Sequence, residues 1–252
     1  MEKQLTTGSS IRAICFDYYG TLVHTRNGEP FVLIDRWLKE SIGKKGDLDF
    51  IERVSMSFAK ERARFLYHMP GFYTGKQLLN NCYSIICHKY QIETQKELFM
   101  EYVKHVFTDT VLYESTEYVL EKLRKKYLIG LVTNADNDIL YESLHKHVLT
   151  FDFIVTSEME RCNKPGKEIF QKALKCAKLP AHEILMVGDS WTEDILPSRE
   201  LGMHSAYINR KHIMQDVDND ILQITNIWEL LDFLDINEKV IEEEIIINCI
   251  NY

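Results

Sequence analysis

Short apolar runs that end abruptly in polar residues are the feature that most restricts how this chain can fold. The first run, Ile11–Phe16, ends at Asp17, and Gly20 and Thr21 follow within four residues. Short runs closed by turn residues are typical of buried strands in a parallel sheet. Four more runs follow in the second half of the chain, at Leu128–Thr133, Phe153–Thr156, Ile184–Gly188 and Met203–Ile208.

Helical patterns separate these later runs. Apolar residues at helical spacing mark Leu120–Tyr127, Leu140–Val148 and Ile169–Ala177, and Pro165 suits the first turn of the third helix. Strands that alternate with helices predict an α/β fold, a Rossmann-like doubly wound parallel sheet with helices on both faces. In such sheets the ligand binds outside the carboxyl ends of the strands, so Asp17 is placed where a ligand would lie.

A long helical stretch interrupts this alternation. From Phe31 to about Leu112 the strand-like runs stop, and Pro70-Gly71 breaks a pattern that is otherwise helical. A crossover between parallel strands usually needs only a dozen or so residues, and this stretch is far longer. We therefore predict a helical cap domain, residues 31–111, inserted into an α/β core domain made of residues 1–30 and 112–252.

Two smaller segments give local expectations. Asn27-Gly28 is a strong hairpin signal and predicts a small flap beside Asp17. Near the C-terminus, Ile227–Leu234 has a helical pattern. The segment Ile236–Tyr252 stays open, because Ile245–Ile247 suits an edge strand, a packing arm or a partially ordered tail equally well.

Composition excludes several functions. The net charge is −8, so binding to nucleic acid or to an anionic membrane, which needs clustered Lys and Arg, is not expected. No run approaches the length of a membrane span, and the N-terminal residues lack an apolar secretion segment, which predicts a cytoplasmic protein. The six cysteines contain no CxxC pair, so neither a zinc site nor a disulfide framework is predicted. His145 and His147, two positions apart on a predicted helix, face different sides and are expected to be exposed.

Reactive side chains gather where the predicted strands end. They are Asp17, Thr133 and Asn134, Lys164 before Pro165, and Asp189 with Asp194. A carboxylate that attacks a phosphoryl group approaches a centre that already carries negative charge, so a cation must lie between them. Mg²⁺ prefers oxygen ligands and usually binds one or two carboxylates together with phosphate and water.

These residues predict phosphoryl transfer. Asp17 and Asp189 would bind Mg²⁺, and Asp194 would hold metal-bound water or a ligand in place. Thr133 would donate a hydrogen bond to a phosphoryl oxygen, and Lys164 would neutralise developing charge and restrain Asp17. A transient aspartyl-phosphate on Asp17 would then be hydrolysed.

The order of these motifs resembles the haloacid dehalogenase superfamily, in which four motifs run here through Asp17–Thr21, Thr133, Lys164 and Asp189–Asp194. The resemblance covers nearly the whole chain and includes a helical cap of type 1 after the first motif. It implies a Mg²⁺-dependent phosphomonoester hydrolase that acts on a small phosphorylated metabolite. It also implies that Thr133, Asn134 and Lys164 bind substrate and that the backbone carbonyl of Tyr19 is a metal ligand.

One residue departs from the phosphatase pattern. Phosphatases of the superfamily usually carry a second Asp two residues after the nucleophile, as acid and base for the leaving group, and Tyr19 stands there. A phenol has an unperturbed pKa of about 10, and side-chain acid catalysis typically contributes about 10²–10⁴-fold. Losing it predicts a slow phosphatase, one restricted to good leaving groups, or another reaction.

Two alternatives follow from Tyr19. The 2-haloacid dehalogenases of the superfamily share the pattern D-x-Y-G-T and use the Asp without metal. They tend, however, to replace the acidic motif that is intact here at Gly188–Ser190, and Asp35–Lys39 does not match their cap motif WRxxQLxY. The other alternative is a weakly catalytic binding or regulatory member. The sequence leaves the metabolite and the oligomeric state open.

Overall fold

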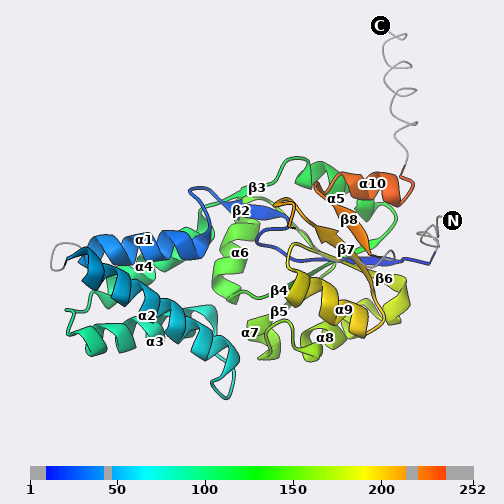
Figure 1. Cartoon of the computed structure of the whole chain (residues 1–252). Coiled ribbons are helices and arrows are strands. Elements are labelled where there is room, and N and C mark those ends of the chain that lie inside the picture. The colour runs from blue at the N-terminus through cyan, green and yellow to red at the C-terminus, as the bar shows by residue number, and fades with distance from the viewer. Residues whose placement is uncertain (1–9, 43–46, 214–220, 237–252) are drawn as a thin grey trace, which may run out of the picture.

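The computed structural model describes residues 10–42, 47–213 and 221–236. Six strands form its main sheet: β1 (Ala13–Phe16), β4 (Leu128–Thr133), β5 (Phe153–Thr156), β6 (Ile184–Gly188), β7 (His204–Ile208) and β8 (Leu222–Ile224). They are all parallel and lie in the order β5-β4-β1-β6-β7-β8 (Figure 1). The chain proceeds from β1 to one side and then returns to the other, so the order reverses between β1 and β6. Ligands of doubly wound sheets bind at this reversal, at the carboxyl ends of the strands.

Two hydrophobic cores cover the two faces of the sheet, because successive side chains of a strand point to opposite faces. Ile14 and Phe16 of β1 pack into one core, and Ala13 and Cys15 pack into the other. The helices of the first core are α5 (Thr116–Arg124), α6 (Asn137–Lys146) and α10 (Glu229–Phe233). The helices on the other side are α7 (Ser157–Glu160), α8 (Lys167–Ala177) and α9 (Leu196–Glu200). Short helical turns at Ala181–Glu183 and Trp191–Ile195 precede and follow β6.

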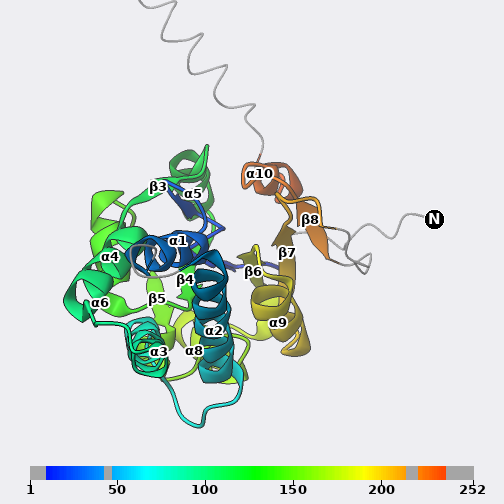
Figure 2. The same ribbon diagram turned by 60° about the vertical axis from the view of Figure 1, so that its left-hand side comes forward.

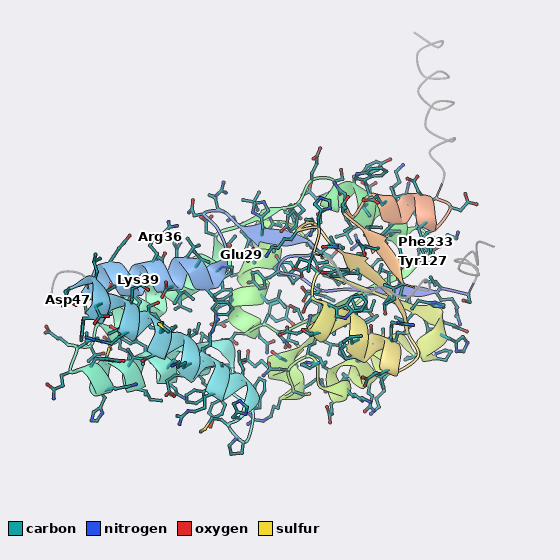
Figure 3. The ribbon with its side chains drawn as sticks, in the orientation of Figure 1. Glu29, Arg36, Lys39, Asp47, Tyr127 and Phe233 are labelled. Atoms are coloured by element: carbon teal, nitrogen blue, oxygen red, sulfur yellow. The ribbon has the colours of Figure 1, made fainter. Side chains whose placement is uncertain are left out.

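Four helices form a separate body beside the sheet, which we call the helical unit. They are α1 (Pro30–Ile42), α2 (Leu48–Tyr67), α3 (Gly75–Tyr90) and α4 (Lys96–Thr108), and they enclose a third core of their own. The unit is joined to the sheet through β2 (Val23–Thr25) and β3 (Thr110–Leu112), which pair antiparallel (Figures 1 and 2). Arg36 and Lys39 lie along α1, whereas Tyr127 and Phe233 lie together at the opposite end of the molecule (Figure 3). The division into domains at residues 31 and 111 stays a prediction.

Most predicted strands are confirmed, and one local prediction is wrong. The bounds of β4, β5 and β6 are those predicted, while β1 and β7 begin later than expected, at Ala13 and His204. The Asn27-Gly28 flap does not form, because the turn leads directly into α1 and β2 pairs with a strand more than eighty residues later. A hairpin signal describes only the turn, and here the turn starts a helix.

Near the C-terminus the structure describes the chain as far as residue 236. Helix α10 is shorter than predicted, and the possible strand Ile245–Ile247 lies outside the described residues. Among the helices of the described ranges, none combines the length and the apolarity that crossing a bilayer requires.

Candidate active site

Three carboxylates meet at the carboxyl ends of β1 and β6. Asp17 directly follows β1, and its backbone N–H donates to the carbonyl of Val187 at 2.9 Å, which extends the pairing of the two strands. Asp189 follows β6, and Asp194 lies in the helical turn after it. One oxygen from each of the three carboxylates lies within 4.8 Å of the others. Adjacent strand ends therefore bring together residues that are 177 positions apart in the chain, from Asp17 to Asp194.

Gly20 allows this close approach. Its φ of +86° lies in the left-handed region that favours glycine. A Cβ at this position would lie 2.3 Å from Oδ2 of Asp189, well inside van der Waals contact. The glycine of the first motif is thus required both by the backbone and by the neighbouring carboxylate.

Lys164 joins two of the carboxylates. Its Nζ donates to Oδ1 of Asp17 at 2.6 Å and to Oδ1 of Asp194 at 2.5 Å. The lysine side chain is 2% exposed, so both ion pairs are shielded from water. Charge-assisted bonds of this length are the strong class of hydrogen bond, and they fix the orientation of Asp17.

Asn134 holds the lysine in place through the backbone. Its Oδ1 accepts a hydrogen bond from the N–H of Lys164 at 2.7 Å, and its Nδ2 donates to the carbonyl of Lys164 at 3.1 Å. The side chain predicted to bind substrate is thus engaged with the loop that carries Lys164. Its amide also donates to Oε2 of Glu193 at 3.3 Å.

The electrostatics of the cluster favour a further cation. Burial and the negative charge of Asp17 raise the pKa of Asp189 to about 6, although Lys164 and Arg210 oppose the shift. Burial also raises the pKa of Asp194, against the attraction of Lys164. In the described part of the chain, Lys164 is the cation that bonds these carboxylates, and it is shared between two of them. A hard divalent ion such as Mg²⁺ fits this all-oxygen donor set and would offset the excess charge.

Thr133 and Thr21 lie at the same edge of the sheet as the carboxylates. Thr133 ends β4 and is buried, and the register of β1 with β4 brings it to the same edge of the sheet as Asp17. The hydroxyl of Thr21 lies 3.4 Å from both Oδ2 of Asp17 and Oδ1 of Asp189.

The phenol of Tyr19 is engaged in a hydrogen bond and is not available to transfer a proton. Its phenol donates to the carbonyl of Phe107 at 2.8 Å, and its ring packs edge-on against Tyr18 and Phe107. Burial raises the pKa of Tyr19 well above its usual value, and the neighbouring carboxylates add to the shift. The phenol therefore stays protonated at neutral pH and ties the loop after Asp17 to the end of α4.

Arg210 is a residue of the site that the sequence patterns did not indicate. It follows β7 and donates to the backbone carbonyls of Gly20 and Thr21, the second at 3.0 Å. Its guanidinium lies 3.6 Å from the ring centroid of Tyr113. The arginine thus braces the loop after Asp17. Glu193 was also missed, although its place inside the Asp189–Asp194 motif was a usable signal.

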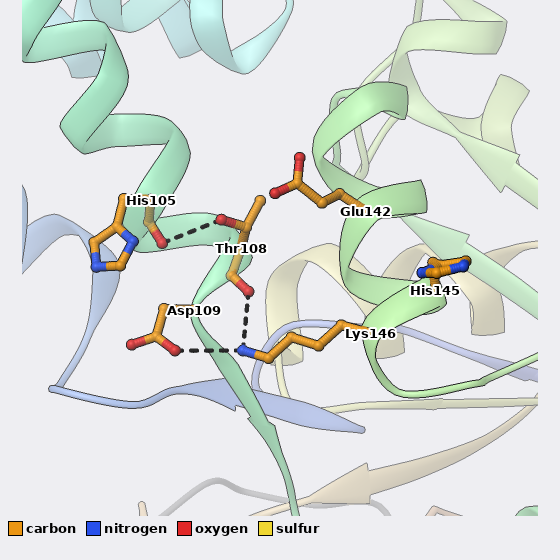
Figure 4. Close-up of a pocket in the computed structure, with 6 residues that line it drawn as sticks. All are labelled: His105, Thr108, Asp109, Glu142, His145 and Lys146. Atoms are coloured by element: carbon orange, nitrogen blue, oxygen red, sulfur yellow. Dashed lines mark hydrogen bonds and ion pairs between the residues drawn. The ribbon is translucent and has the colours of Figure 1, made fainter.

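A surface cavity of about 410 Å³ lies elsewhere, between α4 and α6 (Figure 4). Its lining residues are His105, Thr108, Asp109, Glu142, His145 and Lys146. None of the carboxylates that surround Lys164 lines it. His147, predicted to be exposed, is instead half-buried next to this region, where its Nε2 lies 2.9 Å from the hydroxyl of Thr110.

Relatives of this chain include phosphatases and hydrolase domain-containing proteins. It is 40% identical over 102 residues to a haloacid dehalogenase-like hydrolase domain-containing protein 3 of Danio rerio, covering 35% of this chain and 42% of the relative. It is 33% identical over 92 residues to a glyceraldehyde 3-phosphate phosphatase of Pyrococcus abyssi, covering 35% and 39%. It is 34% identical over 97 residues to the pyrimidine 5'-nucleotidase YjjG of Escherichia coli, covering 37% and 43%. The matched segments thus span less than half the length of these relatives.

Solved structures share the fold over almost their whole length. A haloacid dehalogenase-type (HAD) phosphatase from Thermococcus onnurineus is similar with a TM-score of 0.66 and 22% identity, covering 89% of this chain and 98% of that one. A 2-haloacid dehalogenase from Pseudomonas syringae is equally similar, with a TM-score of 0.67, 21% identity and coverage of 89% and 98%. Residues 71–208, more than half of the chain, match the family of haloacid dehalogenase-like hydrolases. Together with the parallel sheet and the ordered motifs, this match establishes that the chain belongs to the haloacid dehalogenase-like hydrolase family.

Proposed function

We propose that this chain hydrolyses phosphomonoesters of small metabolites, with Asp17 as the nucleophile and Mg²⁺ as the cofactor. The observation that carries the proposal is the buried bridge of Lys164 between Asp17 and Asp194, with Asp189 beside it. A buried cluster of like charges costs stability, and its position at the carboxyl ends of the strands, where the strand order reverses, favours a chemical role. Relatives named as a glyceraldehyde 3-phosphate phosphatase and a pyrimidine 5'-nucleotidase support a small phosphorylated substrate.

Asp17 is oriented for attack by its two neighbours. Lys164 binds Oδ1, and Oδ2 lies beside the hydroxyl of Thr21. A carboxylate oxygen of Asp17 would form a bond to phosphorus as the bond to the alcohol oxygen breaks, giving an aspartyl-phosphate and an alkoxide. Water then attacks phosphorus, phosphate leaves, and the Asp17 carboxylate is restored. Lys164 and Thr133 would bind the phosphoryl oxygens, while Asn134 keeps Lys164 in reach of them.

The metal would be held by the carboxylates of Asp17 and Asp189 and the backbone carbonyl of Tyr19, with Asp194 acting through a bound water. When bound, it would neutralise the charge between the attacking carboxylate and the phosphoryl group. The alkoxide still needs a proton, and the phenol of Tyr19, bonded to Phe107, does not supply it. We therefore expect faster hydrolysis of esters whose leaving groups are acidic, such as aryl phosphates, than of alkyl phosphates.

Tyr19 also favours a second candidate, a 2-haloacid dehalogenase, in which Asp17 would displace halide from carbon. That reaction needs no leaving-group acid and no metal, so Tyr19 would be no handicap. The carboxylate cluster speaks against it, because Asp189 and Asp194 add negative charge that an incoming carboxylate substrate would have to overcome.

Phosphate release from a panel of small phosphoesters, with Mg²⁺ and with EDTA, separates the candidates. We expect release that requires Mg²⁺ and is lost in Asp17→Asn. No release from any ester, or release that survives Asp17→Asn, would overturn the proposal. Chloride release from 2-chloropropionate in the presence of EDTA would establish the dehalogenase, and ligand binding without turnover would establish a binding or regulatory member.

A further inference from the structure

A buried carboxylate next to the active site holds the tip of the helical unit. Asp136 directly precedes α6, and its two oxygens accept hydrogen bonds from the first backbone N–H groups of α3. Oδ1 accepts from Gly75 at 2.6 Å, and Oδ2 accepts from Lys76 at 2.8 Å. These N–H groups have no partner within their own helix, and a negative charge at a helix N-terminus is favourable. The Asp136 side chain thus accepts hydrogen bonds from the free N–H groups at the start of α3, although it lies sixty residues away in the chain.

The fit at this contact is close. Asp136 is only 5% exposed, so water does not replace these bonds in the observed arrangement. A Cβ added to Gly75 would lie 3.2 Å from Oδ1 of Asp136, which is tighter than ordinary contact. Outside the buried pair, Nζ of Lys76 forms an ion pair with Oδ2 of Asp138 at 2.5 Å.

This contact lies at the sheet-facing end of the helical unit, on the side away from its connections through β2 and β3. The chain enters and leaves the unit through β2 and β3, and α4 packs against α6 on that side, where Lys104 pairs with Glu142 at 2.7 Å. The turn between α2 and α3 lies on the other side of this same end, near α7 (Figure 1). Asp136 therefore provides an attachment of the unit to the core in addition to β2, β3 and the packing of α4 on α6.

The α2–α3 turn, residues 68–74, and the start of α3 contact the segments that follow β4 and β5. On the β4 side, Asp136 binds the start of α3 only two residues after Asn134. On the β5 side, the contact is made by Arg161, three residues before Lys164. Its guanidinium lies 5.7 Å from the ring centroid of Phe72. The turn is therefore fixed beside the two loops that carry Asn134 and Lys164.

We infer that Asp136 is a positioning residue that holds the α2–α3 turn beside the loops of Asn134 and Lys164 and thereby restricts the access of bulky phosphoesters to Asp17. The inference rests on the proposed function, because it assumes that phosphoesters react at Asp17. Asp136 acts by keeping the helical unit closed, and it has no contact with the reacting atoms.

Two variants break the contact from opposite sides. Asp136→Asn keeps the size of the side chain but removes the charge and one acceptor. Gly75→Pro removes the N–H of the first helical position, where proline is tolerated, and Thr74 before it already has the extended backbone that proline requires. Lys76→Ala is the matched control, because it removes the exposed ion pair with Asp138 and keeps the backbone N–H that Asp136 binds.

The readout is the ratio of kcat/KM for a phosphoserine peptide to kcat/KM for glycerol phosphate. We expect Asp136→Asn and Gly75→Pro each to raise this ratio by about tenfold, the effect of losing a hydrogen bond to a charged group. Lys76→Ala should leave the ratio unchanged, and the double variant should add nothing beyond either single one. An unchanged ratio in both single variants, or an equal rise in Lys76→Ala, overturns the inference.

Amide hydrogen exchange gives a test that does not depend on activity. The N–H groups of residues 75 and 76 should exchange at least about tenfold faster in Asp136→Asn than in Lys76→Ala, because their acceptor is weakened only in the former. Equal exchange in the two variants contradicts the contact itself. If the wild type hydrolyses no phosphoester but the exchange differs as expected, the proposed function has failed and the positioning of the turn by Asp136 stands.

Discussion

Lys164 and Lys146 each bridge several oxygen atoms, yet their surroundings differ. Lys164 binds Asp17 and Asp194 with a side chain that is 2% exposed. Lys146 is 40% exposed and donates to Oδ1 of Asp109 at 3.3 Å (Figure 4). It also donates to the carbonyl of Thr110 at 3.1 Å. Pairs in water contribute little because solvent screens them, whereas a buried charge that loses its partner is strongly destabilising.

The comparison shows why the hollow beside Lys146 is not the best candidate for the reaction. Lys146 and Asp109 pair with each other there, and Lys146 attaches β3 to the end of α6. Around Lys164, by contrast, one cation is shared between two buried carboxylates, with Asp189 beside them. Burial and unbalanced charge therefore distinguish the two clusters better than the size of the cavity does.

The largest effect is expected for Lys164→Met. This change leaves the buried Asp17 and Asp194 without their cation, so we expect the free energy of unfolding to fall by about 3–5 kcal/mol. Phosphate release should be lost as well. Urea unfolding measured by circular dichroism, without added metal, checks the stability. A loss below about 1 kcal/mol would show that the carboxylates are neutral or hydrated, contrary to the account.

Lys146→Met is the matched change at the exposed cluster. Because the side chain is 40% exposed, we expect a loss of less than about 1 kcal/mol in the same urea experiment. Phosphate release should be retained, since no residue of the Lys146 cluster contacts Asp17 in the described structure. Loss of turnover in a folded Lys146→Met protein would indicate that the reaction takes place at the Lys146 cluster, contrary to the account.

The smallest effect is a pH dependence at the exposed cluster. Burial lowers the pKa of His147, and the charge of Lys146 lowers it further, although the bond to Thr110 and the charge of Glu117 oppose this. Arg26 also lowers it. His147 is therefore neutral when folded, while the unfolded chain takes up a proton below about pH 6.5. Stability contributed here is present above that pH and falls as the pH drops toward the folded pKa.

His147→Gln removes this titration. The fall in Tm between about pH 7.5 and pH 5.5 should be smaller in the variant than in the wild type. Thermal unfolding of both proteins at the two pH values measures the difference. An equal fall in both would mean that His147 does not titrate differently in the folded and unfolded chain.

Much of the fold could be predicted because its signals are local. The apolar runs of β4, β5 and β6 and the motifs at their ends each lie within a few residues, and parallel order alone brings the ends to one edge. The order of those motifs was sufficient to identify the family, and the match over residues 71–208 confirms it. The metal, the catalytic roles and the cytoplasmic location stay predictions.

What the sequence missed depends on partners far along the chain. Asn27-Gly28 predicted a hairpin, but β2 pairs with β3, which lies far along the chain. Arg210 and Asp136 carry no local signal, since each acts on a backbone more than fifty residues away. The role of Tyr19 was likewise hidden, because its phenol binds the carbonyl of Phe107.

Acid-quenched mass spectrometry during turnover of an aryl phosphate with Mg²⁺ tests the central claim most directly. We predict a protein population that carries one phosphoryl group, located on Asp17 by peptide mapping and missing in Asp17→Asn. Phosphate release without any such population during rapid-quench sampling, or a phosphoryl group on another residue, would contradict Asp17 as the nucleophile.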